Sequence, residues 1–293
     1  MTNRPHFLIT DPSHFGVVYQ INPWMRPDAW HADPAAGLAA ANQGSLALRT
    51  ALIAAGGEVE TVGAVAGLPD LVFPANAAII LDGRALPARF RHPERQGEEA
   101  VFHAAFRSLQ LRGLITEIIE LPEGVIQEGA GDCIWDADRA FFWAGHGQRS
   151  TANSIPAIEQ AFGQRVVPLE LASQRFYHLD TCFCPLAGGK VMFYPPAFTP
   201  GALAAIHAHV RPEDRLEATA EEAGAFCVNA VNIGRYVIVA KAPDSLRLKL
   251  GALGYRLIEV DLAPFILSGG GAYCMTLRLD RRSEPVAAAR AAE

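Results

Sequence analysis

The chain has 293 residues, of which 50% are hydrophobic, 9% aromatic and 19% charged. Such a composition can bury a sizeable core, which excludes a disordered, collagen-like or coiled-coil protein. Lys and Arg number 25 against 31 Asp and Glu, and the resulting formal net charge of −6 offers no general attraction to nucleic acid or to an anionic membrane.

The hydrophobic pattern predicts an α/β protein, because short strand-like runs alternate with helical stretches. Helices are expected at 37–55, 98–111, 154–162, 200–209 and 244–253. Each helix is followed by an edge-type strand, at 58–62, 115–120, 165–170, 215–218 and 255–260. A polar loop then leads to a more apolar strand, at 77–81, 139–143, 190–194, 236–240 and 275–279.

This unit occurs five times, which indicates an internal repeat, although any α/β chain shows some alternation of this kind. A radial array of similar modules turns equivalent loops towards one axis. We therefore expect the residues of the five polar loops to meet at a single central site.

The cysteines and the apolar runs bear on compartment and metal content. Five cysteines, an odd number in a chain of this length, argue against a disulfide framework. The N-terminal residues show no apolar run typical of a signal peptide, and no stretch is long enough to span a bilayer. We expect a cytoplasmic protein. Cys182 and Cys184 form C-x-C without a nearby histidine pair, so no metal site is predicted.

Candidate catalytic side chains lie in the polar loops. Cys274 follows three glycines, whose backbone can approach a ligand closely. A free thiol has a pKa of about 8.5 and is mostly protonated at neutral pH. Because the thiolate is the nucleophile, a positive neighbour or bound cation must increase its fraction. His178 and Asp180 are two residues apart, which on a strand places both side chains on one face. A histidine beside a cysteine supplies the acid and base of nucleophilic catalysis, whereas either residue alone also fits an ordinary core position.

Two other site types are not predicted. The glycine-rich segment from Glu128 to Asp132 lacks the Lys-Ser/Thr of a phosphate loop and any G-x-G-x-x-G pattern. No G-x-S-x-G elbow is present, which argues against a serine hydrolase.

Taken together, these loops resemble those of the pentein, or guanidino-group-modifying, superfamily. It includes arginine deiminases, dimethylarginine dimethylaminohydrolases, amidinotransferases and arginine dihydrolases. The likeness covers nearly the whole chain, and its most specific pieces are His178-x-Asp180, Ser268-Gly-Gly-Gly-x-x-Cys274 and Leu68-Pro69-Asp70-x-Val72-Phe73. The segment Tyr19-x-Ile21-Asn22-Pro23-Trp24-Met25 looks most like the arginine dihydrolase branch.

The resemblance implies an architecture and a nucleophile. The fold is expected to be a five-bladed propeller of ββαβ modules around a closed central pocket. It forms a single catalytic domain over residues 1–293, with an N-terminal segment at 1–30 and a frayed tail at 281–293. By similarity, Cys274 attacks the guanidinium carbon. His178, in contact with Glu128, protonates the leaving amine and then activates water.

The resemblance also implies a substrate-binding set. Asp180 matches an acid that grips the guanidinium nitrogens, in keeping with the preference of a planar cation for carboxylates. Arg95 and Arg149 match arginines that hold the substrate carboxylate or close over it. Further candidates for substrate binding are Asn22, Asp70, Asn76, Asp136 and Gly271.

Asn76 departs from the pattern of deiminases and dimethylarginine hydrolases, which usually carry aspartate at this position. Asparagine, as in the dihydrolase branch, also donates hydrogen bonds and tolerates a neutral ureido group better. We therefore expect a hydrolase of free L-arginine that gives ornithine, carbon dioxide and two ammonia. Alternatives are an enzyme that stops at citrulline, one acting on methylated arginine, an amidinotransferase, or a non-catalytic binding module. No cofactor is expected, and a homodimer is suggested by the family alone.

Overall fold

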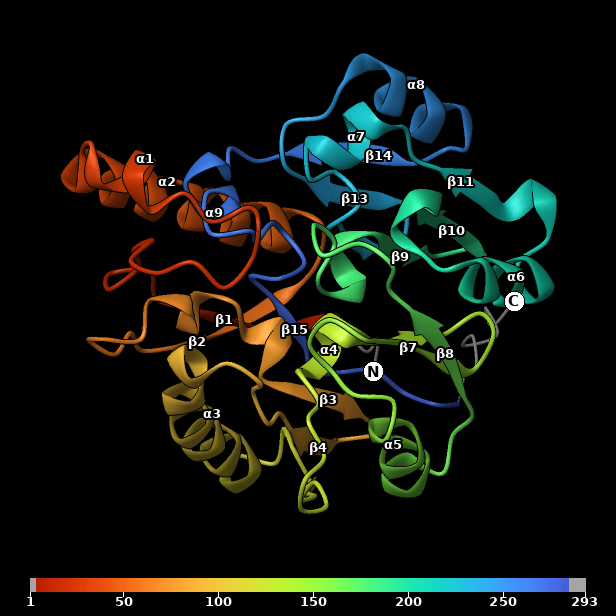
Figure 1. The fold of residues 1–293 in the computed structure, drawn as a ribbon, viewed down its shortest axis with the longest axis horizontal. Coiled ribbons are helices and arrows are strands. Elements are labelled where there is room, and N and C mark those ends of the chain that lie inside the picture. The colour runs from red at the N-terminus through yellow and green to blue at the C-terminus, as the bar shows by residue number, and fades with distance from the viewer. Residues whose placement is uncertain (1–3, 285–293) are drawn as a thin grey trace, which may run out of the picture.

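The computed structural model describes residues 4–284 and contains five small sheets around a common centre (Figure 1). Each sheet has three strands. The first strands are β3 (Ala78–Leu81), β6 (Cys133–Asp136), β9 (Phe183–Leu186), β12 (Val231–Ile233) and β15 (Leu277–Arg278). The middle strands are β4 (Arg84–Pro87), β7 (Phe141–His146), β10 (Lys190–Phe193), β13 (Tyr236–Val239) and β1 (His6–Thr10). The third strands are β5 (Glu117–Ile118), β8 (Val166–Glu170), β11 (Arg215–Glu217), β14 (Arg256–Glu259) and β2 (Glu58–Val62).

The connections within a module follow from strand direction. First and middle strands pair antiparallel, and middle and third strands pair parallel. A parallel pair needs a long crossover, which a helix supplies in each module. These helices are α2 (Pro34–Ala54), α3 (Pro93–Leu111), α5 (Ser154–Phe162), α6 (Pro200–His209) and α8 (Asp244–Ala252).

Shorter helices lie in the connections. The short α-helices are α1 (Pro27–His31), α4 (Gly129–Asp132), α7 (Ala220–Gly224) and α9 (Ala263–Ile266). Single 3₁₀ turns cover Pro69–Val72, Pro74–Asn76, Leu179–Thr181, Pro195–Ala197 and Pro212–Asp214. The turns Pro69–Val72 and Pro74–Asn76 lie before β3, and the turn Leu179–Thr181 lies before β9, so these three turns shape loops that are expected to hold the site.

Local sequence determines where the longer helices begin. The Asp33 carboxylate accepts a hydrogen bond from the Ala36 amide at 3.0 Å, and Pro34 occupies the first helical position. At α6, the Thr199 hydroxyl accepts a hydrogen bond from the Ala202 amide, and Pro200 occupies the first helical position. These residues satisfy or remove backbone donors that a helix leaves unpaired at its N-terminus.

The predicted fivefold repeat and propeller are confirmed, but the content of each unit differs from the prediction. The expected edge-type strands coincide with the five third strands. The expected apolar strands coincide with middle strands in three modules and with first strands in two, so the remaining strand of each module was missed. The missed strands are β1, β4, β6, β9 and β12, of three to five residues, and most are too short to show a period-two pattern.

The ring closes by pairing the two ends of the described chain. β1, from the expected N-terminal segment, is the middle strand between β15 and β2, with Leu8 opposite Leu277. Beyond β15, the Asp82 amide donates to the Arg281 carbonyl at 2.9 Å, and the Ser283 amide donates to the Asp82 carboxylate at 2.9 Å. The rest of the expected tail, from residue 285, lies outside the described residues.

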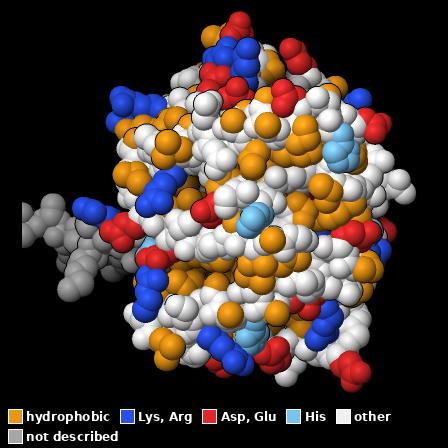
Figure 2. Space-filling view, turned by 90° about the vertical axis from the view of Figure 1, so that its left-hand side faces the viewer, with side chains coloured by type: hydrophobic (Ala, Val, Ile, Leu, Met, Phe, Trp, Pro, Cys, Tyr) orange, Lys and Arg blue, Asp and Glu red, His pale blue; other side chains and the backbone are white. Residues whose placement is uncertain are grey.

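The surface carries charges of both signs. Figure 2 shows acidic, basic and hydrophobic side chains interspersed on the side of the molecule that holds α1, α2 and β2. No helix within residues 4–284 combines the length and apolar character needed to cross a bilayer. Most buried side chains are apolar, but a group of buried polar residues lies at the centre, where the loops before the first strands meet.

Candidate active site

All five loops that precede a first strand contribute a side chain to two hydrogen-bonded groups, which meet in the loop that carries both His178 and Asp180. Asn76 precedes β3, Glu128 precedes β6, His178 precedes β9, Asn229 precedes β12 and Cys274 precedes β15. Asn76 contacts His178, and His178 contacts Glu128. Asp180, from the same loop as His178, contacts Cys274, which in turn contacts Asn229. The convergence expected from the repeat is therefore observed.

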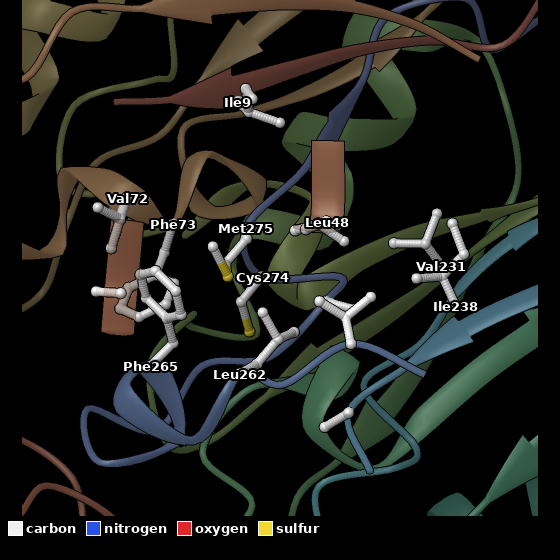
Figure 3. Packing of buried hydrophobic residues seen from close by; sticks show 14 of the residues in the cluster. Ile9, Leu48, Val72, Phe73, Val231, Ile238, Leu262, Phe265, Cys274 and Met275 are labelled. Carbon is white, nitrogen blue, oxygen red and sulfur yellow. The ribbon is translucent and has the colours of Figure 1, made fainter. Parts of the chain in front are cut away.

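The Cys274 thiol is enclosed by protein. Figure 3 shows the residue among apolar side chains, with Phe73 and Phe265 to one side, and only 2% of Cys274 is exposed. Its Sγ lies 3.1 Å from Asp180 Oδ2 and 3.1 Å from Asn229 Nδ2. Burial raises the pKa of the thiol well above its usual value, and the Asp180 carboxylate raises it further. The isolated thiol is therefore protonated at neutral pH and donates to Asp180.

Asp180 has one carboxylate oxygen without a partner. Oδ2 accepts from the thiol, whereas Oδ1 is buried and makes no hydrogen bond within the described structure. Burial raises the pKa of Asp180 to about 7. A buried acceptor costs free energy unless it is paired, so Oδ1 is suited to receive an N–H group from a ligand beside the thiol.

His178 and Glu128 form a tight pair. His178 Nε2 lies 2.7 Å from Glu128 Oε2, and both residues have no exposed surface. Glu128 also accepts from Arg149 Nη1 at 3.1 Å and from the Arg91 amide at 3.0 Å. Burial alone would raise the pKa of Glu128, but Arg149 and His178 outweigh it and hold that pKa well below its usual range. Glu128 is therefore ionised and orients the imidazole.

The orientation of Asn76 determines the tautomer of His178. Arg95 Nη1 donates to Asn76 Oδ1 at 2.8 Å, so the Asn76 amide nitrogen must face His178 Nδ1, 3.4 Å away. His178 Nδ1 then accepts, and its proton lies on Nε2 towards Glu128. Because the contact to Asn76 is long, Nδ1 is the ring nitrogen available to exchange a proton with a substrate.

The arginine expectations have different outcomes. Arg95 is bound through two 2.8 Å bonds to the buried Glu98 and through a third to Asn76. Its guanidinium is thus paired with Glu98 and Asn76. Arg149 donates to Glu128 and, through Nη2, to the Ile21 carbonyl at 3.1 Å.

The N-terminal segment lies against the glycine-rich loop. Asp70 accepts from Ser268 Oγ at 2.9 Å and from the Tyr19 hydroxyl at 3.0 Å, and burial raises its pKa. Asn22 Nδ2 donates to the Ser268 carbonyl at 3.1 Å. These contacts connect residues 19–22 and 70 with the loop that leads to Cys274.

Asp136 does not belong to this group, which corrects its expected role in substrate binding. It lies at the end of β6, four residues after Asp132, and its Oδ2 accepts from Arg139 Nη1 at 2.8 Å and from Trp143 Nε1 at 2.9 Å. Its Oδ1 accepts from the Arg139 amide at 3.1 Å, so both oxygens are occupied by structural partners.

The glycines before Cys274 are explained by packing against protein. A Cβ on Gly270 would lie 2.1 Å from the Phe73 ring, and one on Gly271 would lie 2.9 Å from Asn229 Oδ1. Of these glycines, only Gly269 has a positive φ, at +85°. The space that these glycines leave open is therefore filled by neighbouring side chains of the protein.

Several site residues were not singled out from the sequence. Asn229 is one, and its only signal was its place in the fourth polar loop. Asp132 is another: its carboxylate binds the Leu179 amide at 3.0 Å and the Ser150 hydroxyl at 2.7 Å, which joins the loops of Glu128 and His178. Among residues 4–284, no group of three or more His, Cys, Asp or Glu side chains is placed to hold a metal ion.

Comparison with known proteins gives consistent matches. The family described as N,N dimethylarginine dimethylhydrolase, eukaryotic, matches residues 39–281. The bifunctional arginine dihydrolase/ornithine cyclodeaminase AgrE of Nostoc sp. is 38% identical over 98% of this chain and 39% of its own length. The N(G),N(G)-dimethylarginine dimethylaminohydrolase of Mycobacterium tuberculosis is 33% identical over 93% of this chain and 85% of its own length.

A solved structure supports the same relationship. The binary complex of an AgrE mutant with L-arginine has a TM-score of 0.90 and 37% identity, covering 97% of this chain and 41% of that chain. In both comparisons the present chain spans well under half of the bifunctional relative, about 39% of the length of the protein from Nostoc sp..

Proposed function

The chain belongs to the dimethylarginine dimethylaminohydrolase family of pentein hydrolases, which act on guanidino C–N bonds, and on that premise we propose that its substrate is free L-arginine. The products are ornithine, carbon dioxide and two ammonia, formed from one arginine and two waters. Residues 1–293 act as one catalytic domain. The single observation that carries this proposal is the unpartnered Asp180 Oδ1 beside the buried thiol of Cys274.

A guanidinium group suits this site on electrostatic grounds. Its N–H groups would pair with Asp180 Oδ1, and its planar shape matches a carboxylate. Its positive charge offsets the burial and the Asp180 charge that raise the pKa of Cys274. Substrate binding thus increases the thiolate fraction of Cys274.

The first round of hydrolysis uses Cys274 and His178. The thiol proton ends on His178, and the thiolate sulfur bonds to the guanidinium carbon. The terminal nitrogen takes the proton from His178 and leaves as ammonia, which gives a covalent amidino intermediate. Neutral His178 then takes a proton from water as the water oxygen attacks that carbon. The C–S bond breaks, the departing sulfur takes the remaining hydroxyl proton, citrulline is formed, and His178 returns its extra proton to solvent.

The second round is assigned to Asn76. The ureido group of citrulline is neutral, so an aspartate at this position would face its carbonyl oxygen with a like partial charge. The Asn76 amide nitrogen can instead donate to that oxygen, because Arg95 already occupies Oδ1. A second attack by the thiolate releases the second ammonia, and water releases a carbamate that loses carbon dioxide to give ornithine.

The remaining roles follow from position. Arg149 is assigned to the substrate carboxylate, since only part of its guanidinium is used by Glu128 and Ile21. Arg95 is assigned to fixing Asn76. Asp70 and Asn22 are assigned to the amino-acid end of the substrate, next to residues 19–22.

A second candidate is dimethylarginine hydrolysis, which the 33% identity with the mycobacterial enzyme supports. A binding module without turnover is disfavoured because the thiol of Cys274 contacts Asp180 and the imidazole of His178, from the same loop as Asp180, contacts Glu128.

The test is incubation of the purified protein with L-arginine while citrulline, ornithine and ammonia are separated over time. Ornithine with two ammonia per arginine is the expected result, and the Cys274→Ser variant should form neither product. Citrulline accumulating alone would refute the second round. No turnover of arginine, with turnover of methylated arginine, would refute the substrate assignment.

A further inference from the structure

Asn229 makes four hydrogen bonds around the proposed nucleophile, and it is fully buried. Its amide oxygen accepts from the Tyr273 amide at 3.0 Å and from the Cys274 amide at 3.2 Å. Its amide nitrogen donates to the Asp180 carbonyl at 3.1 Å and to Cys274 Sγ at 3.1 Å. The side chain therefore uses its whole hydrogen-bonding capacity between the nucleophile and the loop of Asp180.

The contact to sulfur is the chemically informative one. Asp180 Oδ2 faces the sulfur from the other loop, and it can pair with a thiol but repels a thiolate. The donors near the sulfur are the Asn229 amide nitrogen and the backbone of Gly271, and both lower the pKa of the thiol. Once the proton has left, these donors are the groups that can still hydrogen bond to sulfur.

Gly271 is part of the same arrangement. A Cβ at this position would lie 2.9 Å from Asn229 Oδ1 and 2.9 Å from Phe226 Cδ1. The last glycine of the run thus leaves room for the Asn229 amide, so the sequence Gly-x-x-Cys and the distant asparagine form one structural unit.

We infer that Asn229 is a catalytic residue whose amide N–H holds Cys274 Sγ as a thiolate aimed at the substrate carbon. This inference rests on the proposed role of Cys274 as the nucleophile. Other ionisable groups that interact with the thiol are Asp180 and Tyr177, both from the loop before β9, which also carries His178; Glu128, from the loop before β6, contacts His178. None of these residues is changed in the Asn229 variants, and Asn229→Ala removes the amide N–H that faces the sulfur.

The experiment measures the rate of Cys274 alkylation by iodoacetamide against pH, without substrate, with the modified peptide identified by mass spectrometry. Asn229→Ala should raise the apparent pKa of the thiol by at least about one unit, which is a tenfold lower thiolate fraction below that pKa. Asn229→Asp keeps an acceptor for both backbone amides but places an acidic oxygen against sulfur, so it should raise the pKa at least as much. The kcat/KM for the guanidino substrate should fall at pH 7 and recover in part at high pH.

A matched control is Asn232→Ala, three residues along the chain. Asn232 binds the Ala187 amide and the carbonyls of Gly234 and Tyr236, and none of its contacts involves the thiol. Its alkylation profile should match that of the parent protein. If Asn229→Ala does not fold, Asn229→Asp carries the test alone.

An unchanged alkylation profile in a folded Asn229 variant would overturn the inference, even if activity were lost. Because alkylation requires no turnover, this outcome is distinct from failure of the proposed function, in which the parent protein would not hydrolyse arginine at all.

Discussion

Replacing Asn76 with aspartate tests the most specific part of the proposed chemistry. In the structure Arg95 holds Asn76 Oδ1 at 2.8 Å, and the amide nitrogen faces His178 Nδ1 at 3.4 Å and the Glu128 carbonyl at 3.4 Å. Aspartate would retain the bond to Arg95 but present a negative oxygen to His178. That oxygen is compatible with His178 only when Nδ1 carries a proton.

The size of the effect follows from this geometry. Aspartate at position 76 has no N–H to offer the ureido oxygen of citrulline. Leaving such a buried acceptor unpaired costs about 1–3 kcal/mol, which lowers the rate of the second round by about 5- to 150-fold. The neutral ureido group would meet a carboxylate instead of an N–H donor, so citrulline should accumulate in place of ornithine.

The assay is the ratio of citrulline to ornithine over time, together with kcat for each product. Asn42→Asp, on the exposed surface of α2, makes the same change in charge away from the site and should leave both unchanged. An Asn76→Asp enzyme with the parental product ratio and the parental kcat for ornithine would refute this account of the second round.

Two further predictions concern ligand binding and packing. Burial raises the pKa of Asp180 to about 7, so Asp180 loses its charge as the pH falls below 7. The affinity of a Cys274→Ser variant for L-arginine, measured by calorimetry, should therefore increase by up to about tenfold per pH unit as the pH rises to 7, and level off above it. Affinity that does not vary between pH 5 and 8 would contradict this. Gly270→Ala places a Cβ 2.1 Å from the Phe73 ring and should lower the free energy of unfolding by about 1–3 kcal/mol in urea titrations. Gly251→Ala, in α8 with open space around it, should have no such cost, and equal stability of the two variants would be the contrary result.

The repeat was predictable because the helices and the runs that hold the third strands alternate regularly along the chain, even where the strand itself is as short as the two residues of β5. Two of the missed strands, β6 and β9, contain cysteine or proline within four residues and resemble parts of polar loops. β1 was missed for a different reason: its partner β15 lies some 270 residues away along the chain, and local sequence carries no information about that pairing.

The meeting of the loops that carry Cys274 and His178 was predictable, because each loop holds a chemically distinctive residue at the same place in the repeat. The partners of Arg95 were not, because an arginine near a carboxylate in sequence also fits a surface position. Only the fold shows that Glu98 and Asn76 take up its donors. Asn229 was equally hidden, since asparagine in a loop normally indicates a turn.

The closing of the ring by β15 also sets the order in which activity can arise during synthesis. Cys274 precedes β15 by only two residues, and β15 must add to the edge of β1, which was made first. A growing chain that has completed four modules therefore still lacks Cys274, the proposed nucleophile, and its first strand still has an open edge. On the proposed mechanism, hydrolysis begins only after the last strand has been made, so chains halted earlier do not consume substrate.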